Sequence, residues 1–191
     1  MRQQRISVPR GIAVVIFALA ILQGPTSVAA GDVPESVGPQ GFLIWEPPRN
    51  LPELAFEDKD GNPLTLADFQ SKVILLNIWA TWCAPCREEM PTLDSLQAQL
   101  GGEQFEVIAL SVDHAGIRVV EKFYQETGVQ HLRKYIGPST LATSKLGIEG
   151  VPTTLLIDHD GREIGRLVGA AEWDSSAMVD LMTRAIDGVP D

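Results

Sequence analysis

The sequence has 191 residues, of which 45% are hydrophobic and 21% are charged. This composition is typical of a globular protein with one domain and short extensions, and it excludes a chain that is disordered throughout. The net charge is −10, and without the first thirty residues 12 basic side chains face 25 acidic ones, which gives −13. Because such a surface repels phosphate backbones, we expect no nucleic-acid partner.

The first thirty residues (1–30) have the pattern of an export signal. Three arginines precede the apolar run 11–22, and small residues follow at 27–30. A cleavable secretory signal has this order of charge, apolar run and small residues. The alternative is an uncleaved anchor over 11–30, a stretch barely long enough to span a membrane. Positive charge stays inside in both cases, so the rest of the chain is expected outside the cytoplasm, in the periplasm.

Residues 31–50 contain four prolines and three glycines. We interpret this stretch as a linker without helix or sheet, since both residue types interrupt regular structure. The apolar group 42–45 is expected to pack on the flank of the domain that follows, which begins at residue 51.

The first half of that domain reads as alternating strands and helices. Leu54 and Phe56 alternate with other residues as in a half-buried strand, and Thr65 with Asp68 predicts a short capped helical turn. The longer elements are two strands buried on both faces and two helices: 73–79, 83–100, 105–112 and 117–127. Pro91 lies inside the first of these helices and should kink it.

The second half predicts a short strand at 134–136, a helix at 139–146, a hairpin of 153–157 with 163–168, and a helix from 174 to about 186. The first two buried strands should be parallel and joined by a right-handed crossover. The hairpin should add antiparallel strands on one edge. The expected fold class is therefore α/β, with a central mixed sheet between helix layers.

The chain has only two cysteines, Cys83 and Cys86. A disulfide between residues three apart closes a very short loop and adds little stability. We therefore interpret the two cysteines as a reactive pair rather than as a structural crosslink. The first turn of a helix has free N–H groups and a positive dipole end, and both should stabilise a thiolate on Cys83 as the attacking nucleophile. Cys86 lies further into the helix and should resolve the mixed disulfide, while Pro85 suits the first helical turn.

The same residues weigh against a bound metal or haem. Structural zinc requires four ligands, and the three histidines, His114, His131 and His159, are scattered through the sequence. Attachment of c-type haem requires a histidine directly after the second cysteine, where this chain has Arg87. We expect no metal site and no cofactor beyond a redox-active Cys83–Cys86 disulfide.

The stretch Trp82–Cys86 at a strand-to-helix turn, with Val151-Pro152-Thr153 just before a later strand, resembles the thioredoxin superfamily. The resemblance covers roughly residues 50 to 188. It implies a three-layer thioredoxin-like fold over 51–191, with helices on both faces of the sheet, an N-terminal hairpin extension and a mid-domain insertion. It also implies a cis-proline loop at Val151 and Pro152 that lies against the dithiol and binds the substrate peptide, next to contacts from Trp82 and Pro85.

The longer stretch 77–91 is similar to the exported TlpA/ResA-like branch, and 169–173 resembles its TlpA end. Cytosolic thioredoxins have a buried aspartate where this chain has Asn77, which cannot take a proton. The branch has a glutamate three residues after the second cysteine instead, and Glu89 matches it. The resemblance therefore implies that Glu89 accepts the proton of Cys86. Without the resemblance, Glu89 would be interpreted as a solvated charge on a helix face.

The leading hypothesis is a protein-disulfide reductase, because a dithiol in an oxidising compartment commonly reduces particular disulfides. The resemblance implies two classes of protein substrate, a copper-site assembly factor of cytochrome oxidase and the haem-attachment cysteines of apocytochrome c. A membrane thiol transporter would supply the electrons, because the sequence has no nucleotide-binding motif. The alternatives are a Cu(I)-binding chaperone with the two sulfurs as ligands, an oxidase that donates disulfides, and a peroxidase.

Overall fold

A computed structural model describes residues 34–138, 140 and 145–188. The predicted signal segment and most of the predicted helix at 139–146 lie outside these residues. Residues 31–191 form one compact unit. No helix within the described ranges has the length and apolar character needed to cross a membrane.

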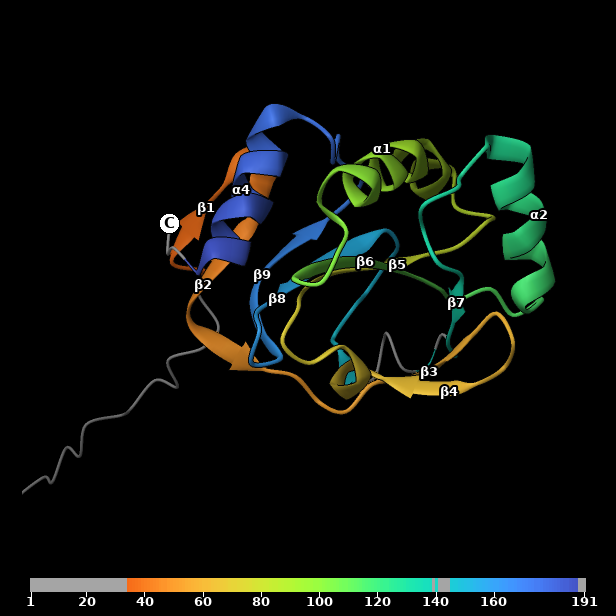
Figure 1. Cartoon of the computed structure of the whole chain (residues 1–191), viewed down its shortest axis with the longest axis horizontal. Coiled ribbons are helices and arrows are strands. Elements are labelled where there is room, and N and C mark those ends of the chain that lie inside the picture. The colour runs from red at the N-terminus through yellow and green to blue at the C-terminus, as the bar shows by residue number, and fades with distance from the viewer. Residues whose placement is uncertain (1–33, 139, 141–144, 189–191) are drawn as a thin grey trace, which may run out of the picture. The chain divides into compact units, whose positions relative to one another are not determined.

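One mixed sheet organises this unit, with the strand order β1-β2-β9-β8-β5-β6-β7-β3-β4 (Figure 1). Its strands are β1 (Ser36–Val37), β2 (Leu43–Asn50), β3 (Ala55–Asp58), β4 (Pro63–Thr65), β5 (Val73–Trp79), β6 (Phe105–Ser111), β7 (Tyr135–Ile136), β8 (Thr153–Ile157) and β9 (Arg162–Val168). The helices that pack on it are α1 (Ala84–Leu100), α2 (Ile117–Thr127) and α4 (Ser176–Asp187), and two 3-10 turns are η1 (Pro39–Gly41) and η2 (Leu66–Phe69). The α/β class and the mixed sheet are as predicted.

The centre of the sheet is β5, in which all seven residues are buried. It pairs in parallel with β6 along its full length and antiparallel with β8 on its other side. Burial on both faces explains why this strand is a nearly continuous apolar run. The turn that carries the two cysteines therefore follows a strand that is buried at every residue.

The interpretation of 31–50 as a linker without sheet is wrong. β2 pairs with β9 through Leu43 opposite Arg166 and Ile44 opposite Gly165, and β1 pairs with β2. The prolines are accommodated because the register shifts between Ile44 and Arg49, and an irregular outer strand tolerates residues that cannot donate a ladder hydrogen bond. Burial favours the pairing, because Phe42 is fully buried at the start of β2.

The same pairing corrects the placement of the β8–β9 hairpin. We predicted it at one edge, but β1 and β2 extend the sheet beyond β9. The opposite edge is the β3–β4 hairpin, which joins through β7. Aromatic rings pack beneath this hairpin, with the Phe56 and Tyr135 ring centroids 5.5 Å apart. The β3–β4 hairpin, which corresponds to the predicted N-terminal extension, thus lies at the edge of the sheet remote from β9.

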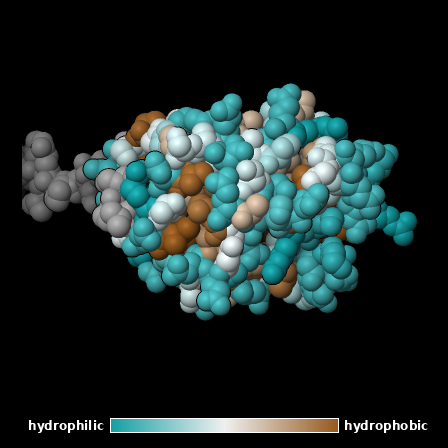
Figure 2. Space-filling view, turned by 45° about the horizontal axis from the view of Figure 1, so that its top comes forward, coloured by the Kyte–Doolittle hydropathy of each residue, from teal (hydrophilic) through white to brown (hydrophobic). Residues whose placement is uncertain are grey.

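The helices begin and end close to the predicted residues. Cys83 is the N-cap of α1, and α1 continues through Pro91 to Leu100. Gly128 ends α2 in the left-handed conformation, with a φ of 75° that glycine adopts without steric cost. The surface in Figure 2 is mostly hydrophilic, as the acidic composition predicts, and is interrupted by hydrophobic patches.

Gly165 tests the placement of β2 in the sheet. A Cβ at this position would lie 2.5 Å from Phe42 Cε1 and 2.6 Å from the Leu43 carbonyl oxygen. Replacement of Gly165 by alanine should therefore lower the free energy of unfolding by about 1–3 kcal/mol, as measured by urea denaturation. Gly102→Ala is the matched control, because a Cβ there meets open space. Equal stability of the two variants would contradict the pairing of β2 with β9.

Candidate active site

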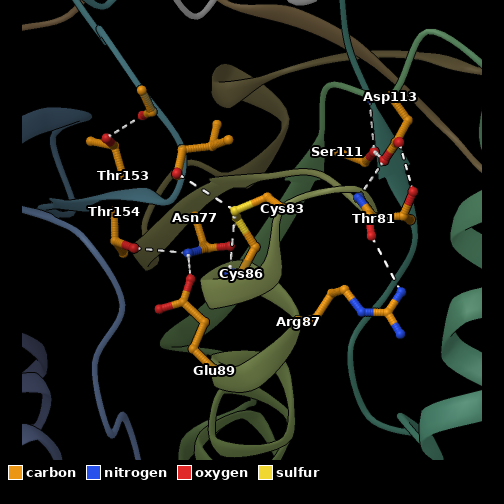
Figure 3. The surroundings of a disulfide bond; sticks show 12 residues. Asn77, Thr81, Cys83, Cys86, Arg87, Glu89, Ser111, Asp113, Thr153 and Thr154 are labelled. Carbon is orange, nitrogen blue, oxygen red and sulfur yellow. Dashed lines mark hydrogen bonds between the residues drawn. A yellow bond between two sulfur atoms is a disulfide. The ribbon is translucent and has the colours of Figure 1, made fainter.

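A disulfide joins Cys83 to Cys86 at the turn from β5 into α1, with the two Cα atoms 5.3 Å apart (Figure 3). Cys83 is 6% exposed, whereas Cys86 is fully buried in the first turn of α1. Both cysteines are thus buried in the disulfide form, and Cys83, the predicted attacking residue, keeps the larger exposure. The disulfide form is the oxidised half of a dithiol–disulfide couple.

The surroundings of Cys83 provide for a negative charge on its sulfur. The backbone N–H of Cys86 donates to Cys83 Sγ at 3.3 Å, as a helix donates to its N-cap. Pro85 occupies the first turn of α1, where its missing N–H has no cost. After reduction, the same N–H group and the helix dipole would stabilise a thiolate on Cys83.

The loop before β8 lies against the disulfide. The Val151–Pro152 peptide bond is cis, and the Val151 carbonyl oxygen lies 3.6 Å from Cys83 Sγ. The N–H of Gly169 donates to the Pro152 carbonyl at 2.9 Å, and Thr153 Oγ1 donates to the Gly150 carbonyl at 2.8 Å. These bonds fix the loop, so the sequence-predicted residues Val151 and Pro152 do meet the cysteine pair.

Large apolar side chains are exposed at the site. Trp82, directly before Cys83, is 68% exposed, and Val168 at the end of β9 is 71% exposed. Val168 pairs with Thr153, and so lies near the cis-proline loop. Exposed apolar side chains at an otherwise buried disulfide provide a contact surface for another protein.

The turn itself is held by a buried aspartate that sequence reasoning missed. Asp113 follows β6, and its carboxylate accepts from the Thr81 N–H at 2.8 Å, from Thr81 Oγ1 at 2.7 Å and from Ser111 Oγ at 2.8 Å. Arg87 donates to the Thr81 carbonyl at 3.3 Å. The available signal was the position of Asp113 just after the buried strand β6. Because β5 and β6 are parallel, the residues that follow them lie at the same edge of the sheet.

Glu89 lies beneath the cysteines, 2% exposed. Three groups donate to its carboxylate: Asn77 Nδ2 at 2.9 Å, Trp173 Nε1 at 2.8 Å and the Ala171 N–H at 3.2 Å. The interpretation of Glu89 as a solvated helix-face charge is therefore wrong. Trp173 and Ala171 were not predicted as site residues, although they belong to the stretch 169–173 that carried the TlpA resemblance.

Burial is the dominant influence on Glu89 and raises the pKa of its carboxyl group. The bonds from Trp173, Asn77 and Ala171 act in the opposite direction because they favour the charged form. A carboxyl group with a raised pKa can exchange a proton with a thiol more readily than an ordinary glutamate. The site thus places a buried carboxyl group with a raised pKa three residues along the helix from Cys86.

Two of the three histidines, His131 and His159, bond to groups other than the cysteines. His131 Nδ1 lies 3.0 Å from Asp94 Oδ2, and the ring nitrogens of His159 lie 3.0 and 3.1 Å from the carbonyl oxygens of Ser71 and Ile186. Among the residues that the structure describes, no three His, Cys, Asp or Glu side chains are arranged to hold a metal ion.

The raised pKa of Glu89 predicts a pH-dependent stability. The folded state holds this proton to higher pH than the unfolded chain, whose glutamate titrates near 4.5, so stability falls as pH rises from about 4.5 through the folded pKa. The free energy of unfolding of the oxidised protein is measured by urea denaturation at several pH values. In Glu89→Gln this decrease of stability with pH should be absent. Glu88→Gln, at the exposed neighbouring position, should keep it. An identical slope in both variants would contradict the raised pKa.

Comparison with known proteins identifies the family. Residues 47–181 match the Redoxin family. Thiol-disulfide oxidoreductase ResA of Bacillus thuringiensis subsp. konkukian is 31% identical over 134 residues, which cover 68% of this chain and 76% of that protein. ResA of Bacillus subtilis is 28% identical over 125 residues, which cover 63% and 66%.

Solved structures agree with this relationship. A Chlorobium tepidum protein assigned as thiol:disulfide interchange protein DsbE has a TM-score of 0.64 and 28% identity, over 73% of this chain and 96% of that one. A DsbF homologue from Corynebacterium diphtheriae has a TM-score of 0.63 and 25% identity, over 81% and 96%. The chain therefore belongs to the Redoxin family, as a TlpA/ResA-like thiol–disulfide oxidoreductase of the thioredoxin superfamily.

Proposed function

We propose that this oxidoreductase works as a reductant of specific protein disulfides outside the cytoplasm. The observation that carries the proposal is the asymmetry of the site. Cys83 meets the surface between the start of α1 and the Val151 carbonyl, whereas Cys86 is enclosed next to a buried acid. This arrangement suits a two-step exchange in which each sulfur has a separate task.

In the first step, the Cys83 thiolate attacks a partner disulfide, so that a Cys83–partner disulfide forms and the partner's other sulfur leaves as a thiolate. The cis-proline loop at Val151 and Pro152 would hold the partner's backbone beside Cys83, and Trp82 and Val168 would contact its apolar side chains. In the second step, Cys86 gives its proton to Glu89 and attacks Cys83. The Cys83–Cys86 disulfide forms, and the partner leaves with two more electrons than it brought.

The proposed direction rests on the compartment, because a dithiol in an oxidising environment commonly serves to reduce particular disulfides. Among the described residues, one N–H group, that of Cys86, donates to Cys83 Sγ. A strong oxidant of this class owes its potential to a strongly stabilised reduced form. The single N–H donor supports a thiolate able to attack a disulfide, and a reductant requires no stronger stabilisation than this.

The proposed partners are cysteines that must be reduced before they bind a cofactor. They belong to a copper-site assembly factor of cytochrome oxidase or to apocytochrome c, and the similarity of 169–173 to TlpA favours the former slightly. The net charge of −10 and the exposed Trp82 fit a partner with basic and apolar residues next to its cysteines. A membrane thiol transporter would return the oxidised protein to the dithiol form in the periplasm.

The reduction potential tests the direction. Equilibration with glutathione, followed by the intrinsic tryptophan fluorescence, should give a value near that of thioredoxin, about −270 mV. A value near the oxidant end of the range, about −120 mV, would contradict a reductant and assign the protein as a disulfide donor.

Trapping identifies the partner. In Cys86→Ser the second step cannot occur, so the mixed disulfide at Cys83 should accumulate and can be isolated from periplasmic extract for mass spectrometry. The control is Cys83→Ser, which retains the buried sulfur and should capture no more than background. Equal capture by the two variants would contradict the assignment of Cys83 as the attacking residue.

A further inference from the structure

The side chain of Asn77 carries a polar atom whose bonding is incomplete. Asn77 lies in β5 and is fully buried. Both protons of its Nδ2 are used, one by Glu89 Oε1 and one by Thr154 Oγ1, each at 2.9 Å. Within the described part of the chain, nothing donates to its Oδ1. A buried acceptor without a donor costs about 1–3 kcal/mol, so its retention calls for a physical reason.

The orientation of the amide indicates where a donor could come from. Because Nδ2 is directed to Glu89 and Thr154, Oδ1 lies at the opposite edge of the planar amide group. Cys86 and Glu89 are three residues apart in α1 and therefore lie on the same face of the helix. Figure 3 shows the Asn77 oxygen turned to the side where Cys86 lies. Cys86 is fully buried, so water does not compete for its sulfur.

In the oxidised protein, the sulfur of Cys86 has no proton to donate. Two external thiols reduce the Cys83–Cys86 bond: they form a disulfide with each other, two electrons pass to the protein sulfurs, and of the two thiol protons one goes to solvent. With Cys83 as the thiolate, Cys86 takes up one proton and becomes a thiol that is free to rotate about its Cα–Cβ bond. A donor thus appears at this place only in the reduced state.

We propose that Asn77 Oδ1 accepts a hydrogen bond from the Cys86 thiol in the reduced protein. Asn77 is then a positioning residue, because its amide takes no proton. Its Oδ1 holds the Cys86 thiol and its Nδ2 holds the Glu89 carboxylate, so that one amide group positions both partners of the proposed proton exchange. The bond also stabilises the reduced form over the oxidised form. The proposal rests on the dithiol–disulfide couple and not on the direction in which the couple works.

The S–H stretching band of the reduced thiol reports this bond directly. In Cys83→Ser, Cys86 is the one remaining cysteine of the chain, so infrared spectroscopy sees a single thiol. We expect a band at the low frequency typical of a hydrogen-bonded thiol, which shifts upward when Asn77→Leu is added. Thr154→Val is the matched control, since it removes the other partner of the Asn77 amide and should leave the band in place. Asn77→Ala removes the same acceptor if leucine prevents folding.

The redox equilibrium supplies the second measurement. In the intact protein, Asn77→Leu should favour the disulfide about ten-fold in equilibrium with glutathione, which corresponds to a potential about 30 mV more negative. Thr154→Val should leave this constant unchanged. A band and an equilibrium constant that respond equally to the two substitutions would overturn the proposal. The proposed reductant role is tested by the absolute potential of the unaltered protein, so either proposal can fail without the other.

Discussion

The burial of one carboxylate is the constraint on which the site depends. Glu89 enters the interior because α1 packs its inner face on β5, and a buried carboxylate must be hydrogen-bonded to persist there. Its donors come from Asn77 in the central strand and from Ala171 and Trp173 in the segment before α4. The acid therefore fixes the first turns of α1 relative to the sheet and to the chain after β9, and with them the two cysteines.

The two sides of the disulfide follow from this arrangement. On the outer side, the strand-to-helix turn is held by Asp113 through Thr81, and the Val151 carbonyl lies against Cys83. On the inner side, Cys86 is enclosed by apolar packing, next to an acid whose pKa is raised by burial. Cys83 keeps a small exposure while Cys86 is kept from solvent, which is the arrangement on which the proposed order of exchange rests.

Sequence patterns predicted the bounds of those elements whose ends are marked by characteristic residues. The bounds of β5, α2 and β8 agree with prediction because apolar runs, glycines and the cis-proline loop mark their ends. Residues 43–50 were misread because prolines were taken as breakers, while burial of Phe42 against β9 decided the outcome. The burial of Glu89 could not be derived from the residues alone, since the Ala171 and Trp173 groups that bind it are 82 and 84 positions away.

The central claim is that Glu89 takes the proton of Cys86 during resolution. It is tested most directly by the rate at which a glutathione mixed disulfide at Cys83 closes to the Cys83–Cys86 bond, followed by stopped flow across pH. The account predicts that Glu89→Gln slows closure by about 100-fold, the lower range for general base catalysis, and removes the rise in rate that accompanies ionisation of the carboxyl group. An unchanged rate and pH profile in Glu89→Gln would contradict it.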